Sequence, residues 1–181
     1  MQYLYDENGK FVQAISGTAE EIVAQIPKGY GATILPPPRN TDYFNGTSWV
    51  AIGAPPEYYL TFDYAERKWK DNRDLAECQN ARWEQIKLQR NQLEFGGFIY
   101  KGKKYDSDST SQGRMLAAFV FAQPVTWTTS DDEVVELSAA EVNELGQALA
   151  THVQTVHARG RLARAAILSS SSPQEVDAVI F

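Results

Sequence analysis

The chain has 181 residues, of which 43% are hydrophobic and 22% charged, and its formal net charge at pH 7 is -6. This composition is ordinary for a folded globular protein, and the negative charge argues against non-specific binding to nucleic acid. A single cysteine, Cys78, excludes an internal disulfide and a site built from several thiolates. The longest apolar stretch, residues 115–122, is too short to span a bilayer, and the first residues lack the features of a secretory signal. We therefore expect a soluble, cytoplasmic protein.

The first 70 residues contain turn signals set between short aromatic segments. Asn8-Gly9 and Asn45-Gly46 are dipeptides typical of tight β-hairpin turns, which need positive φ angles. Residues 55–69 repeat the order of prolines, aromatic residues and turn found in residues 36–50, which indicates a weak internal duplication, and residues 5–11 are a third aromatic–turn–aromatic segment. Between the first two hairpins, Thr18-Ala-Glu-Glu21 is a capping box that predicts a short helix, which Pro27 ends.

From residue 71 onward, the pattern predicts helices joined by short hairpins. Apolar residues at helical spacing predict a helix over 72–95, which Gly96-Gly97 ends. A small hairpin is expected over 98–105. The next predicted helix covers 109–122 and is apolar on nearly all sides, so we expect it to be buried.

The last third of the chain predicts one strand pair and two helices. Residues 125–127 and 134–137 read as antiparallel strands joined by a polar turn. The capping box Ser138-x-x-Glu141 opens a long helix, which we expect Gly160 to interrupt. Ser172-Pro173 opens a short last helix, with proline at a position where its missing N–H is not needed.

The composition changes along the chain. Residues 1–70 hold 12 of the 21 aromatic residues and 6 of the 8 prolines, whereas residues 128–180 hold no aromatic residue. Aromatic segments with turns favour strands, and an aromatic-free segment rich in alanine, leucine and glutamate favours helix. The predicted fold class is α+β: a small hairpin-rich N-terminal domain over 1–70, followed by a mainly helical C-terminal domain with short β-hairpins over 71–181.

No pattern in the sequence points to catalysis or to a metal. His152 and His157 are five residues apart, about 140° around a helix, so we expect exposed positions rather than a pair of zinc ligands. Cys78 has no neighbouring histidine and reads as a small hydrophobic residue. Residues 106–110 begin like a calcium loop but lack its later glycine and glutamate, so we interpret them as a turn that caps the next helix. We expect no enzyme activity, no metal and no cofactor.

The aromatic residues of the N-terminal part are too numerous for so small a domain to bury them all. Tyrosine and tryptophan are common at protein interfaces because they combine a large contact area with a polar group. One interpretation is that most of them form the core of the domain. The other is that some form a partner-binding face, for which the candidates are Tyr43, Phe44, Trp49, Tyr58, Tyr59 and Trp69.

The order of these motifs resembles that of bacteriophage tail-fibre assembly proteins, over about residues 35–178. The N-terminal part of the resemblance lies in Pro36-Pro-Pro, Tyr43-Phe-Asn-Gly, Trp49-Val, Pro55-Pro56, Phe62-Asp-Tyr and Trp69. The C-terminal part resembles a domain of unknown function found in phage tail proteins. It lies in residues 82–90, Gly97-Phe98, residues 105–108, residues 125–129, residues 137–157 and Arg161.

The resemblance implies a chaperone that binds the C-terminal part of a tail fibre or tailspike and promotes its folding and trimerisation. It implies no catalytic residues, no membrane or nucleic-acid partner, and a location in the host-cell cytoplasm. The alternative is a structural tail component or receptor-binding adhesin that stays on the fibre tip and therefore in the virion.

Overall fold

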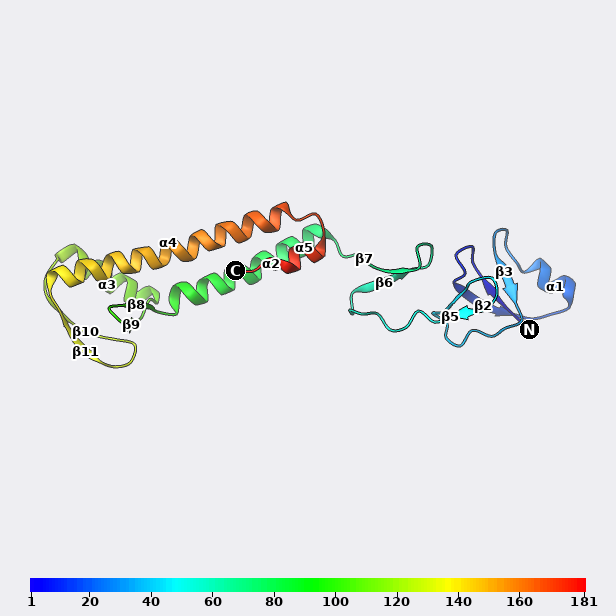
Figure 1. The fold of residues 1–181 in the computed structure, drawn as a ribbon, viewed down its shortest axis with the longest axis horizontal. Helices are drawn as coiled ribbons and strands as arrows, with labels where there is room; N and C mark the ends of the chain where they lie inside the picture. The colour runs from blue at the N-terminus through cyan, green and yellow to red at the C-terminus, as the bar shows by residue number, and fades with distance from the viewer. The chain divides into compact units, whose positions relative to one another are not determined.

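The computed structural model describes residues 1–181 (Figure 1). Helices hold 43% of the residues and strands 22%, which confirms the predicted α+β class with a mainly helical C-terminal part. The chain divides into two compact units, Met1–Arg73 and Asp74–Phe181. Asp71, where we expected the second domain to begin, is the last residue of strand β7 (Lys68–Asp71). No helix is both long and apolar enough to cross a membrane.

The first unit begins with an antiparallel sheet of three strands. Strand β1 (Gln2–Tyr5) lies between β2 (Phe11–Ile15) and β3 (Gly31–Thr33). Helix α1 (Ala19–Ala24) follows β2, and both hydrogen bonds of the capping box between Thr18 and Glu21 are present. The predicted first hairpin and the predicted helix start are therefore confirmed.

Two separate hairpins complete the first unit. Strands β4 (Tyr43–Phe44) and β5 (Trp49–Val50) pair around a turn that begins at Asn45. The side-chain oxygen of Asn45 accepts the N–H groups of Thr47 and Ser48, both at 2.9 Å. Strands β6 (Leu60–Asp63) and β7 pair as Phe62 with Trp69 and Asp63 with Lys68. The first of these hairpins was predicted from its turn residues Asn45-Gly46, and the second from the aromatic spacing that residues 55–69 share with residues 36–50.

The second unit is built on two long helices. Helix α2 (Leu75–Phe95) and helix α4 (Ala139–Ser169) lie side by side and run in opposite directions (Figure 1). The side chain of Gln79, near the start of α2, donates to the carbonyl of Ile167, near the end of α4, at 3.0 Å. Helix α5 (Pro173–Ala178) folds back beside them, with Ser172 as its N-cap and proline in its first turn, as predicted.

The other end of the second unit holds two hairpins and a third helix. Strand β8 (Phe98–Tyr100) pairs with β9 (Lys103–Tyr105), helix α3 (Ser109–Phe121) follows, and β10 (Val125–Thr128) pairs with β11 (Val134–Leu137). Their buried side chains form one core with the first turns of α4. Its members are Phe98, Tyr100, Tyr105, Met115, Leu137, Val142 and Leu145.

Gly160 does not interrupt the long helix, so that prediction was wrong. Helix α4 is continuous from Ala139 to Ser169, and Gly160 is buried within it. A Cβ at this position would lie 3.4 Å from Cδ of Arg90 on α2, at the edge of ordinary van der Waals contact. Glycine here permits a close approach of two helices, and the packing outweighs its low helix propensity of about 1 kcal/mol relative to alanine.

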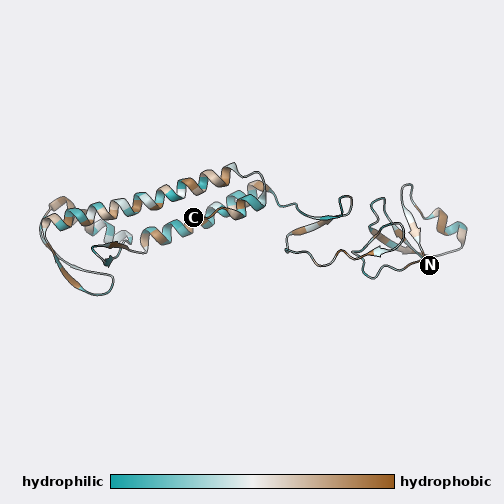
Figure 2. Cartoon of the chain, viewed as in Figure 1, coloured by the Kyte–Doolittle hydropathy of each residue, from teal (hydrophilic) through white to brown (hydrophobic).

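The prediction that residues 109–122 form a buried helix was also wrong. Helix α3 has the predicted length, with Asp108 as its N-cap, but Met115 is its only buried residue. The helix rests on α4 and the hairpins with one side, and the apolar side chains on its other sides are exposed. Figure 2 shows the hydrophobic colour of its C-terminal turns. A helix with apolar residues on all sides can be fully buried, or it can leave one face exposed to solvent. The spacing of its apolar residues does not distinguish these two cases.

Candidate functional site

The turn between β1 and β2 positions the first aromatic residues of the candidate surface. One carboxylate oxygen of Asp6 accepts the N–H groups of Asn8 and Lys10, both at 2.9 Å. Gly9 adopts a φ of 84°, and its carbonyl accepts the N–H of Phe44 at 2.8 Å. The Asn-Gly turn therefore does two things: it closes the first hairpin and it holds strand β4 against it.

Phe44 and Trp49 belong to an aromatic cluster inside the first unit. The ring of Phe44 lies 4.8 Å from that of Tyr5 and 5.4 Å from that of Trp49, measured between centroids. The ring of Phe11 lies 5.9 Å from that of Trp49, edge to face, and the indole N–H of Trp49 donates to the Leu35 carbonyl at 2.7 Å. Phe44 is buried and Trp49 half-buried. These two candidates therefore contribute mainly to the packing of their own unit.

A second aromatic cluster joins the hairpin β6–β7 to strand β4. Phe62 lies at its centre, with ring distances of 5.3 Å to Trp69, 5.1 Å to Tyr64 and 6.2 Å to Tyr43. The hydroxyl of Tyr64 donates to the Thr41 carbonyl at 2.8 Å. All four rings are half-buried. Tyr43 and Trp69 are thus packed in this cluster and only partly accessible, and the guanidinium of Arg67 also lies over the ring of Tyr43, 5.0 Å from its centroid.

Tyr58 and Tyr59 form a third group, in the loop that follows the proline pair. The guanidinium of Arg73 stacks on Tyr59 with its central carbon 3.8 Å from the ring centroid. Arg73 also makes a two-pronged ion pair with the nearly buried carboxylate of Asp71, with contacts of 3.0 Å and 2.7 Å. This hydrogen bonding lowers the pKa of the Asp71 carboxyl. Tyr59 is therefore held in place, and Tyr58 touches its edge at 5.2 Å while remaining 91% exposed.

The six candidates therefore do not form one continuous face. They divide into the interior pair Phe44 and Trp49, the half-buried pair Tyr43 and Trp69, and the loop pair Tyr58 and Tyr59. Tyr58 is the one large aromatic side chain of the set that projects almost fully into solvent. Its neighbours Pro55 and Pro56 restrict the backbone of the loop that carries it.

The two histidines are not simply exposed, contrary to the prediction. Both are half-buried and bond to the end of α2: His152 Nε2 lies 2.9 Å from the Leu93 carbonyl oxygen, and His157 Nε2 lies 3.0 Å from a Glu94 carboxylate oxygen. Both histidines therefore contact the last turn of α2, although they lie five residues apart on α4. The five-residue spacing relates the two histidines only to each other and carries no information about a second helix.

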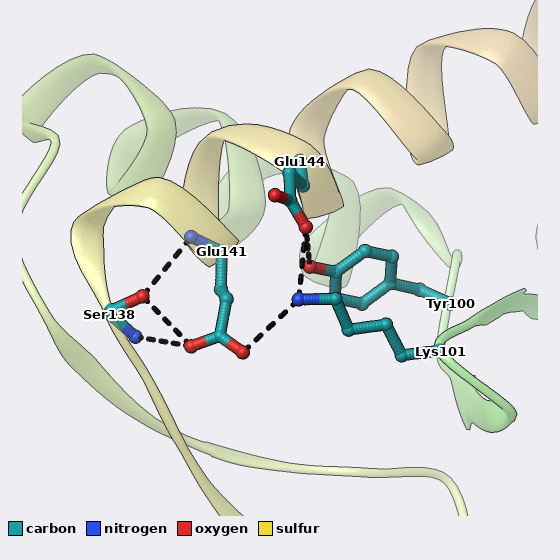
Figure 3. Close-up of polar contacts among 5 residues, drawn as sticks. All are labelled: Tyr100, Lys101, Ser138, Glu141 and Glu144. Carbon is teal, nitrogen blue, oxygen red and sulfur yellow. Dashed lines mark hydrogen bonds and ion pairs between the residues drawn. The ribbon is translucent and has the colours of Figure 1, made fainter.

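The most strongly perturbed ionisable groups tie the hairpin β8–β9 to the first turns of α4 (Figure 3). Glu144 accepts the Tyr100 hydroxyl at 2.6 Å, and the Lys101 ammonium lies 3.0 Å from Glu144 and 3.2 Å from Glu141. The backbone N–H and hydroxyl of Ser138, together with Lys101, lower the pKa of Glu141 to about 2. The hydrogen bonds that the Lys101 ammonium makes with Tyr100, Glu144 and Glu141 raise the pKa of Lys101 above its usual range.

These groups have a structural role. Each acid is matched by a donor, and the pKa shifts favour the charged forms of Glu141 and Lys101, so neither is tuned for proton transfer near neutral pH. No group of three or more histidine, cysteine, aspartate or glutamate side chains is arranged to hold a metal ion. Residues 106–110 act as a helix cap, in which Asp108 accepts the N–H groups of Thr110 and Ser111 at 2.9 and 3.1 Å.

A second exposed apolar surface lies on α3, where sequence reasoning expected burial. Leu116 and Phe119 line a groove of about 810 Å³ between α3, α4 and the end of α2. Val120 and Phe121 lie beside it on the exposed sides of α3. No signal in the sequence distinguishes this exposed side from a buried one, because residues 115–122 are apolar on nearly all sides.

Comparison with known proteins gives one match. The family model described as "Domain of unknown function (DUF4376)" matches residues 77–180. The match begins in the first turn of α2 and ends two residues beyond the end of α5. No curated protein and no solved structure matches the chain.

Proposed function

We propose a function for this chain from the premise that it belongs to the DUF4376 family, which is defined by a domain of unknown function. The chain is proposed to be an assembly chaperone that binds the distal, C-terminal part of a phage-type tail fibre or tailspike and promotes its folding and trimerisation. It acts by binding and carries out no chemical reaction.

The observation that carries the proposal is Tyr58. An aromatic side chain that is 91% exposed contributes nothing to its own unit beyond an edge contact with Tyr59. Tyrosine at such a position supplies a large contact area with few rotatable bonds, which is why it is enriched where proteins bind one another. The half-buried rings of Tyr43 and Trp69 add apolar area elsewhere on the same unit.

The kind of partner is supported by the resemblance of residues 35–178 to tail-fibre assembly proteins. Fibre tips are intertwined β-structures that expose apolar faces and strand edges before the trimer closes. A rigid aromatic surface can cover such a face and suppress aggregation until the three chains have assembled. The acidic net charge of -6 helps to keep such a complex in solution.

Replacing Tyr58 with alanine tests the role of this surface. We expect Tyr58→Ala to weaken binding of the purified full chain to the C-terminal part of its fibre at least tenfold, because an interface anchor of this type contributes more than about 1.4 kcal/mol. The midpoint of thermal unfolding should stay unchanged, because the side chain makes little contact with its own unit. Isothermal titration calorimetry measures the first quantity and circular dichroism the second.

Tyr30→Ala is the matched control, since Tyr30 is a second exposed tyrosine of the same unit outside the proposed surface. It should leave fibre binding within about twofold of the unmodified chain. Equal losses of affinity for the two variants, or none for either, would reject Tyr58 as the contact residue.

A further inference from the structure

Helices α2 and α4 of the second unit form a groove of about 370 Å³ between them, which we call the arginine groove. The positions that line it are three, four or seven residues apart on each helix, so their side chains lie on one side of that helix. They include Trp83 and Arg90 of α2 and His157, Arg161, Arg164 and Leu168 of α4.

Contacts between the two helices fix the shape of the arginine groove. The methylene groups of Arg90 lie over the buried Gly160, where a Cβ would come 3.4 Å from Cδ of the arginine. The guanidinium of Arg164 lies over the ring of Trp83, with its central carbon 4.9 Å from the ring centroid. Two of the three arginines are therefore positioned by packing rather than by an acid.

The positive charge of the arginine groove is not neutralised within the chain. No aspartate or glutamate lines the groove, and its three arginines form no ion pair. Arg161 is exposed, and Arg90 donates to the neighbouring amide oxygen of Asn91 at 2.9 Å. The acid at the end of the same side of α2, Glu94, is paired with His157 at 3.0 Å. Most of the five N–H donors on each guanidinium thus remain free for a ligand.

This charge favours an acidic ligand, and the other lining residues favour a peptide. A guanidinium matches a carboxylate with two parallel hydrogen bonds. Trp83 is half-buried and Leu168 is 59% exposed, so apolar surface lies beside the arginines. A protein segment can offer carboxylates and apolar side chains together, whereas a phosphate backbone offers no apolar side chain. The net charge of -6 also opposes the approach of a long polyanion such as nucleic acid.

The arginine groove is long enough for several residues of a peptide. Residues 157–168 of α4 extend roughly 16 Å along the helix axis, which is about the length of five residues in an extended chain. We propose that the arginine groove binds a short segment of a partner protein in which carboxylates stand next to apolar side chains. This site lies in the second unit, and the proposal does not depend on the role of Tyr58 in the first.

Binding of synthetic peptides to the full chain tests the proposal. The probe is a fluorescein-labelled peptide of about ten residues with a repeat of aspartate, leucine and glutamate, which is long enough to cross the groove. Fluorescence anisotropy should give a dissociation constant below ~100 µM at low salt. A matched peptide with asparagine and glutamine in place of the acids should bind at least ~10-fold more weakly. In nuclear magnetic resonance spectra, the indole N–H of Trp83 should shift when the acidic peptide is added.

Arg161→Glu should weaken binding of the acidic peptide at least ~10-fold, because repulsion replaces attraction inside the groove. Arg114→Glu is the matched control, since it changes the net charge equally at an exposed position of α3 outside the groove. It should leave the dissociation constant within ~2-fold, because the distant charge is screened. Circular dichroism establishes that both variants are folded, and Arg161→Gln replaces Arg161→Glu if that variant unfolds.

Three results would overturn the proposal. The first is no binding of the acidic peptide at concentrations up to ~1 mM. The second is an equal loss of affinity in the Arg161 and Arg114 variants, which would mean that only net charge matters. The third is tighter binding of an inorganic polyphosphate of equal charge, which would assign the groove to a phosphate-bearing ligand. No fibre protein takes part in these measurements, so they leave the proposed chaperone function untouched.

Discussion

Ile167→Ala is expected to lower the free energy of unfolding of the second unit by about 2–5 kcal/mol. Ile167 is fully buried, and it packs with Ile86 and Ala163 where α4 meets α2. Removing its side chain leaves a cavity among helices that cannot close without breaking other contacts, such as the hydrogen bond from Gln79 to the Ile167 carbonyl. Urea unfolding followed by the far-ultraviolet circular dichroism of the helices measures the change.

Leu168→Ala is the matched control, one residue further along the same helix. Leu168 is exposed, so its truncation should change the free energy of unfolding by no more than about 0.5 kcal/mol. Similar losses in the two variants would mean that Ile167 is not at the centre of the contact between α2 and α4.

Gly9→Ala should destabilise the first unit by about 2–4 kcal/mol, through backbone strain and a lost hydrogen bond. Gly9 has a φ of 84°, and a Cβ at this position would overlap the carbonyl oxygen of Phe44. Strand β4 would have to move away, which breaks the bond from the Phe44 N–H to the Gly9 carbonyl and loosens Trp49. Tryptophan fluorescence during urea unfolding reports this change.

Gly46→Ala separates the cost of backbone strain from the cost of the steric clash that Gly9→Ala creates. Gly46 has a similar φ of 98°, but no atom lies within 4 Å of the place where its Cβ would be. We expect a loss of only about 1 kcal/mol, the cost of a left-handed conformation alone. If Gly46→Ala proved as damaging as Gly9→Ala, the turn would not be what holds strand β4.

The local structure of this chain was predictable from its sequence. Asn8-Gly9 and Asn45-Gly46 gave the first two hairpins, and the capping boxes at Thr18 and Ser138 gave the starts of α1 and α4. Each of these signals acts within a few residues, because turn dihedrals and caps are satisfied locally. The predicted class, α+β, followed from their order along the chain.

Features that depend on a distant segment were not predictable in this way. Gly160 reads as a helix breaker until Arg90 of α2 is placed against it. Residues 116–121 read as a buried helix until the structure shows that no element covers their outer side. The two histidines read as exposed until α2 is seen to end beside them. For Gly160 and the histidines, the contacting residue lies more than 20 residues away in the sequence. For residues 116–121, no element of the fold covers the outer side of the helix.

The region that holds the candidate site was predictable from the sequence. Which of its residues are exposed to solvent was not predictable. The sequence shows that aromatic residues are abundant before residue 70, but it does not tell which of them pack together. Phe44 and Trp49 are drawn into one cluster by Tyr5 and Phe11 from the first hairpin. Tyr58 remains exposed because its loop offers it a single neighbour, Tyr59.

Co-expression with the fibre protein tests the proposed chaperone function most directly. The fibre should be recovered as a soluble trimer when the full chain is co-expressed with it, and as aggregate when the chain is absent. The amount of trimer is measured by size-exclusion chromatography with light scattering of the soluble fraction. Soluble trimeric fibre formed equally well without the chain would contradict the proposal.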